Sequence, residues 1–146
     1  MTIITYKDGI MAADSASFRG YMMVSHNNQK IIKTKKGYLV GASGKSVVCD
    51  AFRKWATEHH DNNPDLEWVS DDDEFQGIIV IDDRIVFEYF GKDTNPTIGN
   101  TEYYSIGAAY EMALGAMHAG ASAEQAVAIC IKYHAYCAGE IKTLKL

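Results

Sequence analysis

Thr2-Ile-Ile-Thr-Tyr-Lys-Asp-Gly-Ile-Met-Ala-Ala-Asp-Ser15 carries the strongest structural signal in the sequence. Two β-prone runs, at residues 3–6 and 10–13, flank Lys7-Asp8-Gly9. An Asp-Gly pair between such runs is typical of a tight hairpin turn. We therefore expect the chain to begin as two antiparallel strands.

Three more short strands are expected before residue 45. After a polar break at residues 17–20, candidate strands at 21–24 and 30–34 lie on either side of a turn at His26-Asn27-Asn28. Lys35-Lys36-Gly37 then turns the chain into a strand at 38–42. The first third of the chain is therefore predicted to consist of strands.

The pattern changes at Ser46, where apolar residues recur at helical intervals until about His59 and predict an amphipathic helix. Residues 60–74 are rich in Asp, Asn and Pro and predict a surface connection, with Asp71-Asp72-Asp73-Glu74 as a solvated acidic run. A hairpin is expected next, with strands at 78–81 and 85–90 joined by Asp82-Asp83-Arg84.

The last third predicts two helices and a strand. The helices span about 108–119 and 123–135, the second behind the capping box Ser122-Ala-Glu-Gln125, and the strand covers 140–146. The expected order of elements is strands, a helix, strands, two helices and a strand. This order predicts two sheets between helical layers, which is an α+β, four-layer αββα sandwich. The 146 residues are expected to form a single domain, 1–146.

Composition excludes several function classes. The chain has 14 Lys and Arg against 19 Asp and Glu, and its net charge of -5 repels phosphate backbones and anionic lipids. Because of this charge we expect no nucleic-acid partner. We also expect no membrane partner, because no segment reaches the ~18 apolar residues of a membrane span. Cys49, Cys130 and Cys137 are odd in number and lack CxxC spacing, which favours reduced thiols and a cytoplasmic protein.

Two motifs suggest ligand sites but have the wrong spacing. Gly41-Ala-Ser-Gly44-Lys45-Ser46 lies between a strand and a helix, yet two residues separate its glycines where a phosphate loop needs four. The His59-His60 pair and the acidic run 71–74 match no metal-ligand pattern. We therefore expect no metal and no bound nucleotide.

Thr2 follows the initiator Met1 directly. A small second residue favours removal of Met1, which would leave a hydroxyl and a free α-amine on Thr2. The α-amine titrates near ~7.7–8.0, so at neutral pH part of it is unprotonated and accepts the hydroxyl proton through a water. The alternative is that Thr2 merely begins an edge strand.

The stretch from Thr2 to Lys30 resembles the start of the N-terminal-nucleophile (Ntn) hydrolases of proteasome β-subunit type, which include the bacterial two-component proteasome-like peptidase. Lys7-Asp-Gly-Ile-Met-Ala-Ala-Asp-Ser15 is similar to the first hairpin of that family, and Lys30-Ile31-Ile32 to its lysine strand. Lys30 follows Asp14 by sixteen positions, as in the family. Weaker similarity runs through Leu39-Val-Gly-Ala-Ser-Gly44, Tyr104-Ser-Ile-Gly107 and residues 132–141.

The resemblance implies cleavage of peptide or amide bonds through an acyl-enzyme on Thr2, without a cofactor. Lys30 would lower the pKa of the Thr2 hydroxyl, Asp14 would orient Lys30, and the Gly44 N–H would meet the oxyanion. Both arms of the first hairpin are two residues shorter than in the family. Equal shortening keeps the strand register, so Thr2 is expected beside Asp14.

Three departures from the family pattern keep a second hypothesis open, a catalytically silent structural or assembly subunit. Ala108 replaces a serine, and His134-Ala-Tyr-Cys137-Ala stands where the family has Asp-x-Tyr-Ser/Thr-Gly. Residues 60–74 replace the second long helix of the first helical layer, which implies a reduced layer.

The resemblance also implies a homo-oligomer, as a ring or a helical array, with a possible ATPase partner. The aromatic residues expected either at its interfaces or in the core are Phe87, Tyr89, Phe90, Tyr103 and Tyr104.

Overall fold

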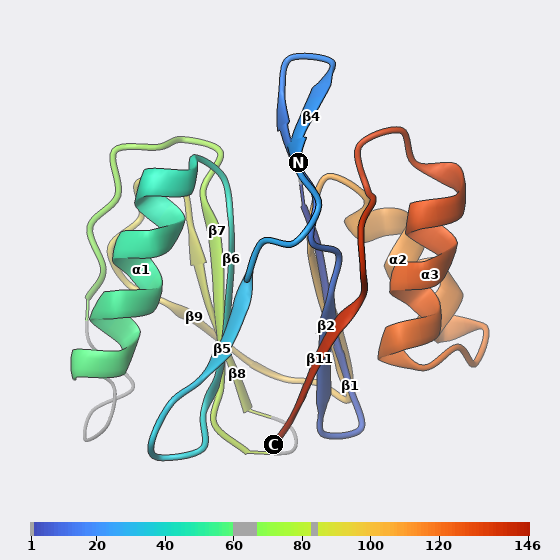
Figure 1. Cartoon of the computed structure of the whole chain (residues 1–146). Coiled ribbons are helices and arrows are strands. Elements are labelled where there is room, and N and C mark those ends of the chain that lie inside the picture. Colours follow the sequence, from blue (N-terminus) through green and yellow to red (C-terminus); the bar gives the residue numbers. More distant parts are fainter. Residues whose placement is uncertain (1, 60–66, 83–84) are drawn as a thin grey trace.

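The computed structural model of the chain describes residues 2–59, 67–82 and 85–146 (Figure 1). These residues contain three helices, two larger antiparallel sheets and a separate two-stranded ribbon. The predicted mixture of helices and antiparallel strands is confirmed.

The four-stranded sheet is built around the opening hairpin. Its strand order is β10-β1-β2-β11. Asp8 and Gly9 have φ angles of 52° and 78°, the left-handed pair that a two-residue turn of type I′ requires. The predicted hairpin is confirmed, with Ile4 opposite Ala13. The strands are β1 (Ile3–Lys7), β2 (Ile10–Ala13), β10 (Tyr103–Gly107) and β11 (Lys142–Lys145).

The five-stranded sheet has the order β5-β6-β7-β8-β9, all neighbours antiparallel. The β7–β8 hairpin was expected, although residues 83–84 of its predicted turn lie outside the described residues. Strand β9 was not expected, because its residues have no period-two alternation of apolar side chains. The strands are β5 (Ile31–Lys33), β6 (Leu39–Ser43), β7 (Gln76–Val80), β8 (Ile85–Phe90) and β9 (Thr97–Asn100).

The helices cover the outer faces of the two sheets. Helix α1 (Ser46–His59) packs on β6 and β7, whereas α2 (Tyr110–His118) and α3 (Ala123–Tyr133) pack on β10, β1 and β2. The predicted capping box is present, since Ser122 Oγ accepts the Gln125 N–H and Gln125 Oε1 accepts the Ser122 N–H. Among the described residues, no helix combines the length and apolarity that crossing a bilayer requires.

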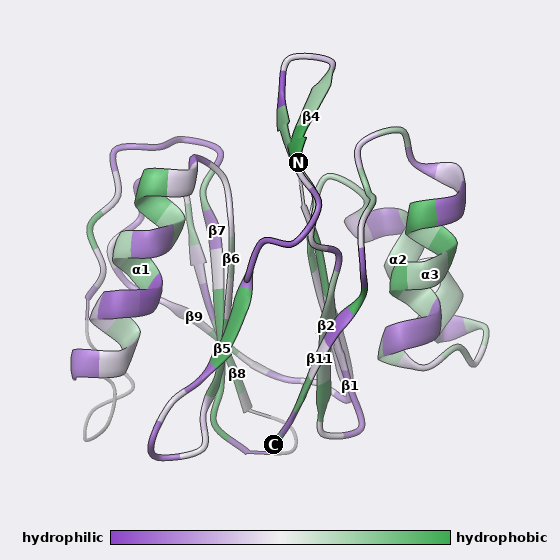
Figure 2. Ribbon diagram, viewed as in Figure 1, coloured by the Kyte–Doolittle hydropathy of each residue, from purple (hydrophilic) through white to green (hydrophobic). Residues whose placement is uncertain are grey.

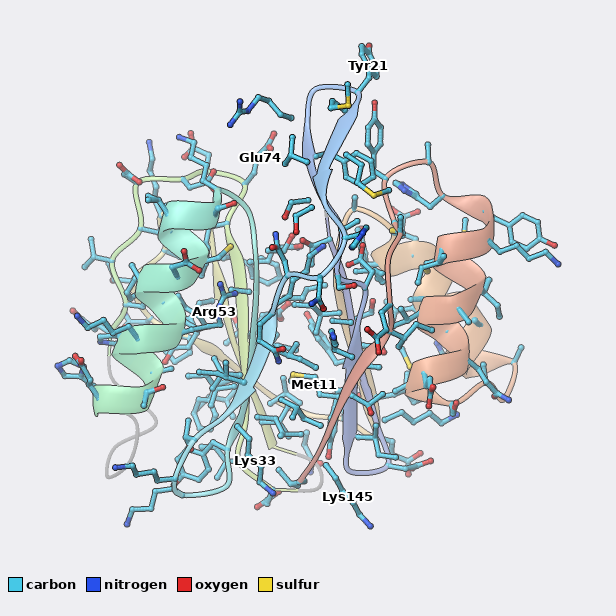
Figure 3. The ribbon with its side chains drawn as sticks, viewed as in Figure 1. Met11, Tyr21, Lys33, Arg53, Glu74 and Lys145 are labelled. Atoms are coloured by element: carbon cyan, nitrogen blue, oxygen red, sulfur yellow. The ribbon has the colours of Figure 1, made fainter. Side chains whose placement is uncertain are left out.

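Three apolar clusters hold these elements together. One lies between α1 and the five-stranded sheet around Phe52, and one between the four-stranded sheet and α2 and α3 around Val127. The third lies between the two sheets and includes Met11, which Figure 3 shows there. Helix α1, the two sheets and the α2–α3 pair therefore follow one another across the molecule (Figure 1).

The aromatic residues considered for an interface divide between core and surface. Tyr89 is 0% exposed and Phe87 5%, and both belong to the α1 cluster. Phe90 is 38% exposed. An interface built on Phe87 and Tyr89 is excluded, because their rings already fill the core.

Residues 17–25 form a ribbon that projects beyond both sheets (Figure 1). Strand β3 (Ser17–Arg19) pairs with β4 (Met22–Ser25), and Gly20 turns the chain between them with φ 59°. The predicted polar break at 17–20 is therefore wrong. The Phe18 ring packs edge-on against Tyr136 at 5.5 Å, a contact with a distant segment that local polarity does not reveal.

Glu88 is an acidic side chain buried between the two sheets. Alternation along β8 points it away from α1, and it accepts a hydrogen bond from the Tyr104 hydroxyl on β10. It is 8% exposed, and burial raises its pKa from an ordinary 4.5 to about 7. At a pH between about 4.5 and 7, the folded protein therefore holds a proton on Glu88, whereas the unfolded chain does not.

We expect the contribution of Glu88 to stability to fall as the pH rises from about 4.5 through 7. Glu88→Gln has no charge to bury, so it does not lose this contribution. The free energy of unfolding of the variant, relative to that of the native protein, should therefore be higher at pH 8 than at pH 5. Urea titrations of both proteins at these two pH values measure the difference. A difference that does not change with pH would contradict this expectation.

Candidate active site

Asp14 and Lys30 form a buried ion pair. Lys30 Nζ donates to Asp14 Oδ1 at 2.9 Å, and the side chains are 9% and 0% exposed, respectively. Asp14 directly follows β2, and Lys30 directly precedes β5, so the pair joins the two sheets. The Ile3 N–H also donates to Oδ1 at 3.1 Å, and the Ala138 N–H to Oδ2 at 3.2 Å. Two backbone donors therefore fix the carboxylate that faces Lys30.

Thr2 precedes β1 at the same end of the hairpin. The Asp14 N–H donates to the Ile3 carbonyl at 3.3 Å, so Asp14 lies opposite Ile3 and diagonal to Thr2. The Thr2 carbonyl accepts the Ala108 N–H at 2.8 Å. A Cβ on Gly107 would lie 2.0 Å from that carbonyl, so only glycine fits beside Thr2. Met1, whose removal was predicted, lies outside the described residues.

A cavity of about 470 Å³ brings three of the predicted site residues together. Thr2, Lys30 and Gly44 line it, whereas Asp14 is fully buried behind Lys30. The β3 end of the ribbon and the link to β5 form one wall, and the β6–α1 connection with one face of α1 forms the other. The remaining lining residues are Ala16, Ser17, Phe18, Asn28, Gln29, Ala42, Lys45, Ser46, Cys49, Asp50 and Arg53.

Gly44 occupies a turn between β6 and α1 that requires glycine. Its φ is 133°, and a Cβ there would lie 2.7 Å from Asp72 Oδ2 and 3.2 Å from Phe75 Cα. Asp72 Oδ2 accepts the Lys45 N–H at 2.9 Å, and Oδ1 accepts the Glu74 N–H at 3.0 Å. The close carboxylate thus braces the turn that carries the Gly44 N–H.

The prediction of a fully solvated acidic run at 71–74 is wrong at Asp72. This residue is 6% exposed, and the hydrogen bond from the Lys45 N–H is the main reason that its pKa lies below its ordinary value. Asp71, Asp73 and Glu74 are exposed, as expected. Asp72 turns inward and supports the turn at Gly44 and Lys45, which both line the cavity.

One face of α1 supplies cavity residues that the sequence motifs do not mark. Ser46, Cys49, Asp50 and Arg53 follow i, i+3, i+4, i+7 spacing and all line the cavity. Burial raises the pKa of the Cys49 thiol to about 11, so the thiol is neutral. Their helical spacing predicts that these four residues share one face of the helix, but it does not predict that this face lines a cavity.

Of the residues that depart from the family pattern, Cys137 lies nearest to the ion pair in the chain, because the N–H of the following Ala138 donates to Asp14 Oδ2. Ala108 donates its N–H to Thr2, and Cys137 is buried in the α2–α3 cluster. His134 Nδ1 accepts the Tyr136 N–H at 3.2 Å, and His134 does not line the cavity. Asp14 is held by backbone N–H groups, which these substitutions leave in place.

Within residues 2–59, 67–82 and 85–146, no three His, Cys, Asp or Glu side chains are grouped so that they could hold a metal ion. His60, half of the His59-His60 pair, lies outside this part of the chain. The described cavity instead combines a hydroxyl, a lysine and a glycine turn.

Comparisons with known proteins identify the fold. No protein-family model and no curated sequence matches the chain. Among solved structures, Thiobacillus denitrificans BPH in complex with epoxomicin matches with a TM-score of 0.66 and 20% identity, over 99% of this chain and 97% of that one. BPH without that compound matches with a TM-score of 0.64 and 18% identity, over 99% and 96%. BPH is a bacterial proteasome homologue, so the fold of this chain is proteasome-like.

Proposed function

We propose that this proteasome-like chain is a threonine-type Ntn hydrolase that cleaves peptide or amide bonds. The proposal takes residues 1–146 as one domain, a four-layer αββα sandwich with a reduced first helical layer. The observation that carries it is the shared cavity of Thr2 and Lys30, with Lys30 held by the buried Asp14 carboxylate. An oriented lysine beside a hydroxyl in a cavity is the arrangement that nucleophilic catalysis needs.

The proposed reaction begins after removal of Met1. The Thr2 α-amine accepts the hydroxyl proton through a water while Oγ1 attacks the substrate carbonyl carbon. Collapse of the tetrahedral intermediate breaks the C–N bond, and the leaving amine takes the proton. Water then hydrolyses the Thr2 ester, which releases a carboxylic acid and restores the hydroxyl. Lys30 stabilises the charge that develops on Oγ1, and the Gly44 N–H donates to the oxyanion.

The Asp14–Lys30 pair favours this proposal over a catalytically silent subunit. Replacing a buried ion pair by apolar residues is often neutral or stabilising, so such a pair is weak evidence for a purely structural role. Charged groups retained beside a cavity are more typical of functional sites. Asp14 also keeps its backbone donors despite Ala108 and Cys137.

Intact mass of the protein from its native host tests the first requirement of the proposal. We expect a mass that corresponds to a chain beginning at Thr2, because only a free α-amine serves as the base. Complete retention of Met1 would contradict the enzyme and favour the silent subunit.

We further propose that the protein works in the cytoplasm as a homo-oligomer, a ring or a helical array, with a possible ATPase partner. The β3–β4 ribbon supplies the physical argument for self-association. It presents consecutive apolar side chains, with Tyr21 94%, Met22 68% and Val24 53% exposed. Figure 2 shows apolar colour on β4, and Figure 3 shows Tyr21 at the tip. An isolated two-stranded ribbon is marginally stable in water, so a second copy that covers it would stabilise both chains.

Tyr21→Ser combined with Met22→Ser is expected to shift the protein toward the monomer, because it removes the two most exposed apolar side chains of the ribbon. Light scattering at micromolar concentration measures the change against the native chain. Val69→Ser, at a 73% exposed residue outside the ribbon, is the matched control. A native protein that is already a monomer would contradict self-association, and an unaffected oligomer would contradict the role of the ribbon.

A further inference from the structure

The cavity beside Thr2 differs in charge from the rest of the protein. The whole chain carries a net charge of -5, yet Lys30, Lys45 and Arg53 line the cavity with Asp50 as the one carboxylate among its lining residues. Lys30 is paired with Asp14, which lies behind it. Arg53 and Lys45 therefore determine the charge that a ligand meets beyond the nucleophile.

Arg53 is positioned as a binding group rather than as a solvated surface residue. Its side chain is 14% exposed, and Figure 3 shows it on the side of α1 that faces the centre of the molecule. Its Nη1 donates to the Lys30 carbonyl at 3.2 Å, and its Nη2 donates to Asp50 Oδ1. Of the five N–H groups of a guanidinium, these contacts use two within the described residues.

The counter-ion of Arg53 lies toward solvent. The Asp50 side chain is 73% exposed, so water screens its attraction for the guanidinium more strongly than it would screen a ligand inside the cavity. Cys49 lies between Ser46 and Arg53 on the same helical face as a neutral thiol. The wall thus offers an uncharged surface for methylene groups and a cation for a terminal anion.

On the basis of the proposed function, we infer that the cavity binds an acidic side chain, Asp or Glu, on the acyl side of the bond that Thr2 attacks. The carboxylate meets the Arg53 guanidinium, with Lys45 at the exposed rim. A charge-assisted hydrogen bond to a partly buried guanidinium is among the strong polar contacts, and the fork of its N–H groups matches a planar carboxylate. The substrate class is therefore a peptide with an acidic residue before the scissile bond.

Binding to the Thr2→Ala variant tests this inference without any requirement for turnover. The probes are two N-acetylated tetrapeptide amides that differ only in their last residue, Glu or Gln. Isothermal titration at pH 7.5 should give about tenfold tighter binding of the Glu peptide, which corresponds to one charge-assisted hydrogen bond. Equal affinities, tighter binding of the Gln peptide, or no binding of either would overturn the inference.

Two substitutions should move the Glu-to-Gln affinity ratio in opposite directions. In the Thr2→Ala background, Arg53→Gln removes the cation, so the ratio should fall toward one. Asp50→Asn removes the competing carboxylate at an exposed position, so the ratio should rise. Lys54→Gln alters an exposed cation that neighbours Arg53 outside the cavity, and it should leave the ratio unchanged. If Arg53 had only a structural role, the two substitutions would not move the Glu-to-Gln affinity ratio in opposite directions. A ratio that moves the same way in both variants would overturn the role of Arg53 in binding the carboxylate.

Hydrolysis assays with the native chain separate this inference from the proposed function. Faster cleavage after Glu than after Gln supports both. Cleavage that is equal after the two residues, or faster after Gln, would overturn the acidic preference and leave the hydrolase proposal standing. No cleavage of any peptide by a chain that begins at Thr2 would overturn the hydrolase proposal, and the titrations would still decide whether the cavity prefers acidic side chains.

Discussion

Replacing Thr2 with alanine is expected to abolish peptide hydrolysis while leaving the protein folded. The substitution removes the hydroxyl that would attack the substrate, and the hydrogen bond from the Ala108 N–H to the Thr2 carbonyl remains because it involves only the backbone. Thr2 belongs to none of the three apolar clusters, so no core cavity opens. We expect turnover at background and a change in unfolding free energy within about 1 kcal/mol.

Two further variants serve as controls for Thr2→Ala. Thr2→Ser retains a hydroxyl and an α-amine, so some activity should remain. Thr97→Ala removes an exposed threonine hydroxyl from β9, away from the cavity, and should leave activity unchanged. Hydrolysis of a peptide panel and urea unfolding are the two measurements. Activity at the native level in Thr2→Ala would exclude Thr2 as the nucleophile.

Lys30→Ala is expected to reduce turnover by about 100-fold or more, because it removes the positive charge next to the developing anion. It also leaves the Asp14 carboxylate, which is 0% exposed, without its ionic partner. Breaking a buried pair in this way typically costs about 3–5 kcal/mol, so the single variant loses both stability and activity. Stability and activity must therefore be measured together.

A double variant separates these two effects. Asp14→Asn with Lys30→Met removes both charges, so most of the stability lost in Lys30→Ala should return while turnover stays reduced by about 100-fold or more. Lys33→Ala changes an exposed lysine at the far end of β5 and should affect neither quantity. Recovery of hydrolysis in the double variant would mean that Lys30 acts only through folding.

Features encoded by neighbouring residues were predictable from the sequence. The Asp8-Gly9 turn and the Ser122–Gln125 capping box depend on local backbone chemistry, and both form where expected. The Asp14–Lys30 contact is not local, and its prediction came from the resemblance, through the spacing of the two residues. The structure places the two side chains within hydrogen-bond distance.

Other parts of the site depend on contacts that no local pattern specifies. Asp72 has the same side chain as Asp71 and Asp73, but it alone of the three turns inward and accepts the N–H of the distant Lys45. Arg53 shares a helical face with Cys49, but the spacing does not reveal that β5 begins beside it. Strand β3 is likewise secured by Phe18 packing on Tyr136, more than a hundred residues away in the sequence.

Covalent labelling tests the central claim most directly. The native protein is treated with a peptide electrophile directed at N-terminal threonine, and the modified residue is mapped by mass spectrometry. The proposed function predicts one adduct, on Thr2 of a chain without Met1, and no adduct in Thr2→Ala. An unmodified protein, or an adduct confined to another nucleophile such as Cys49, would contradict a threonine hydrolase.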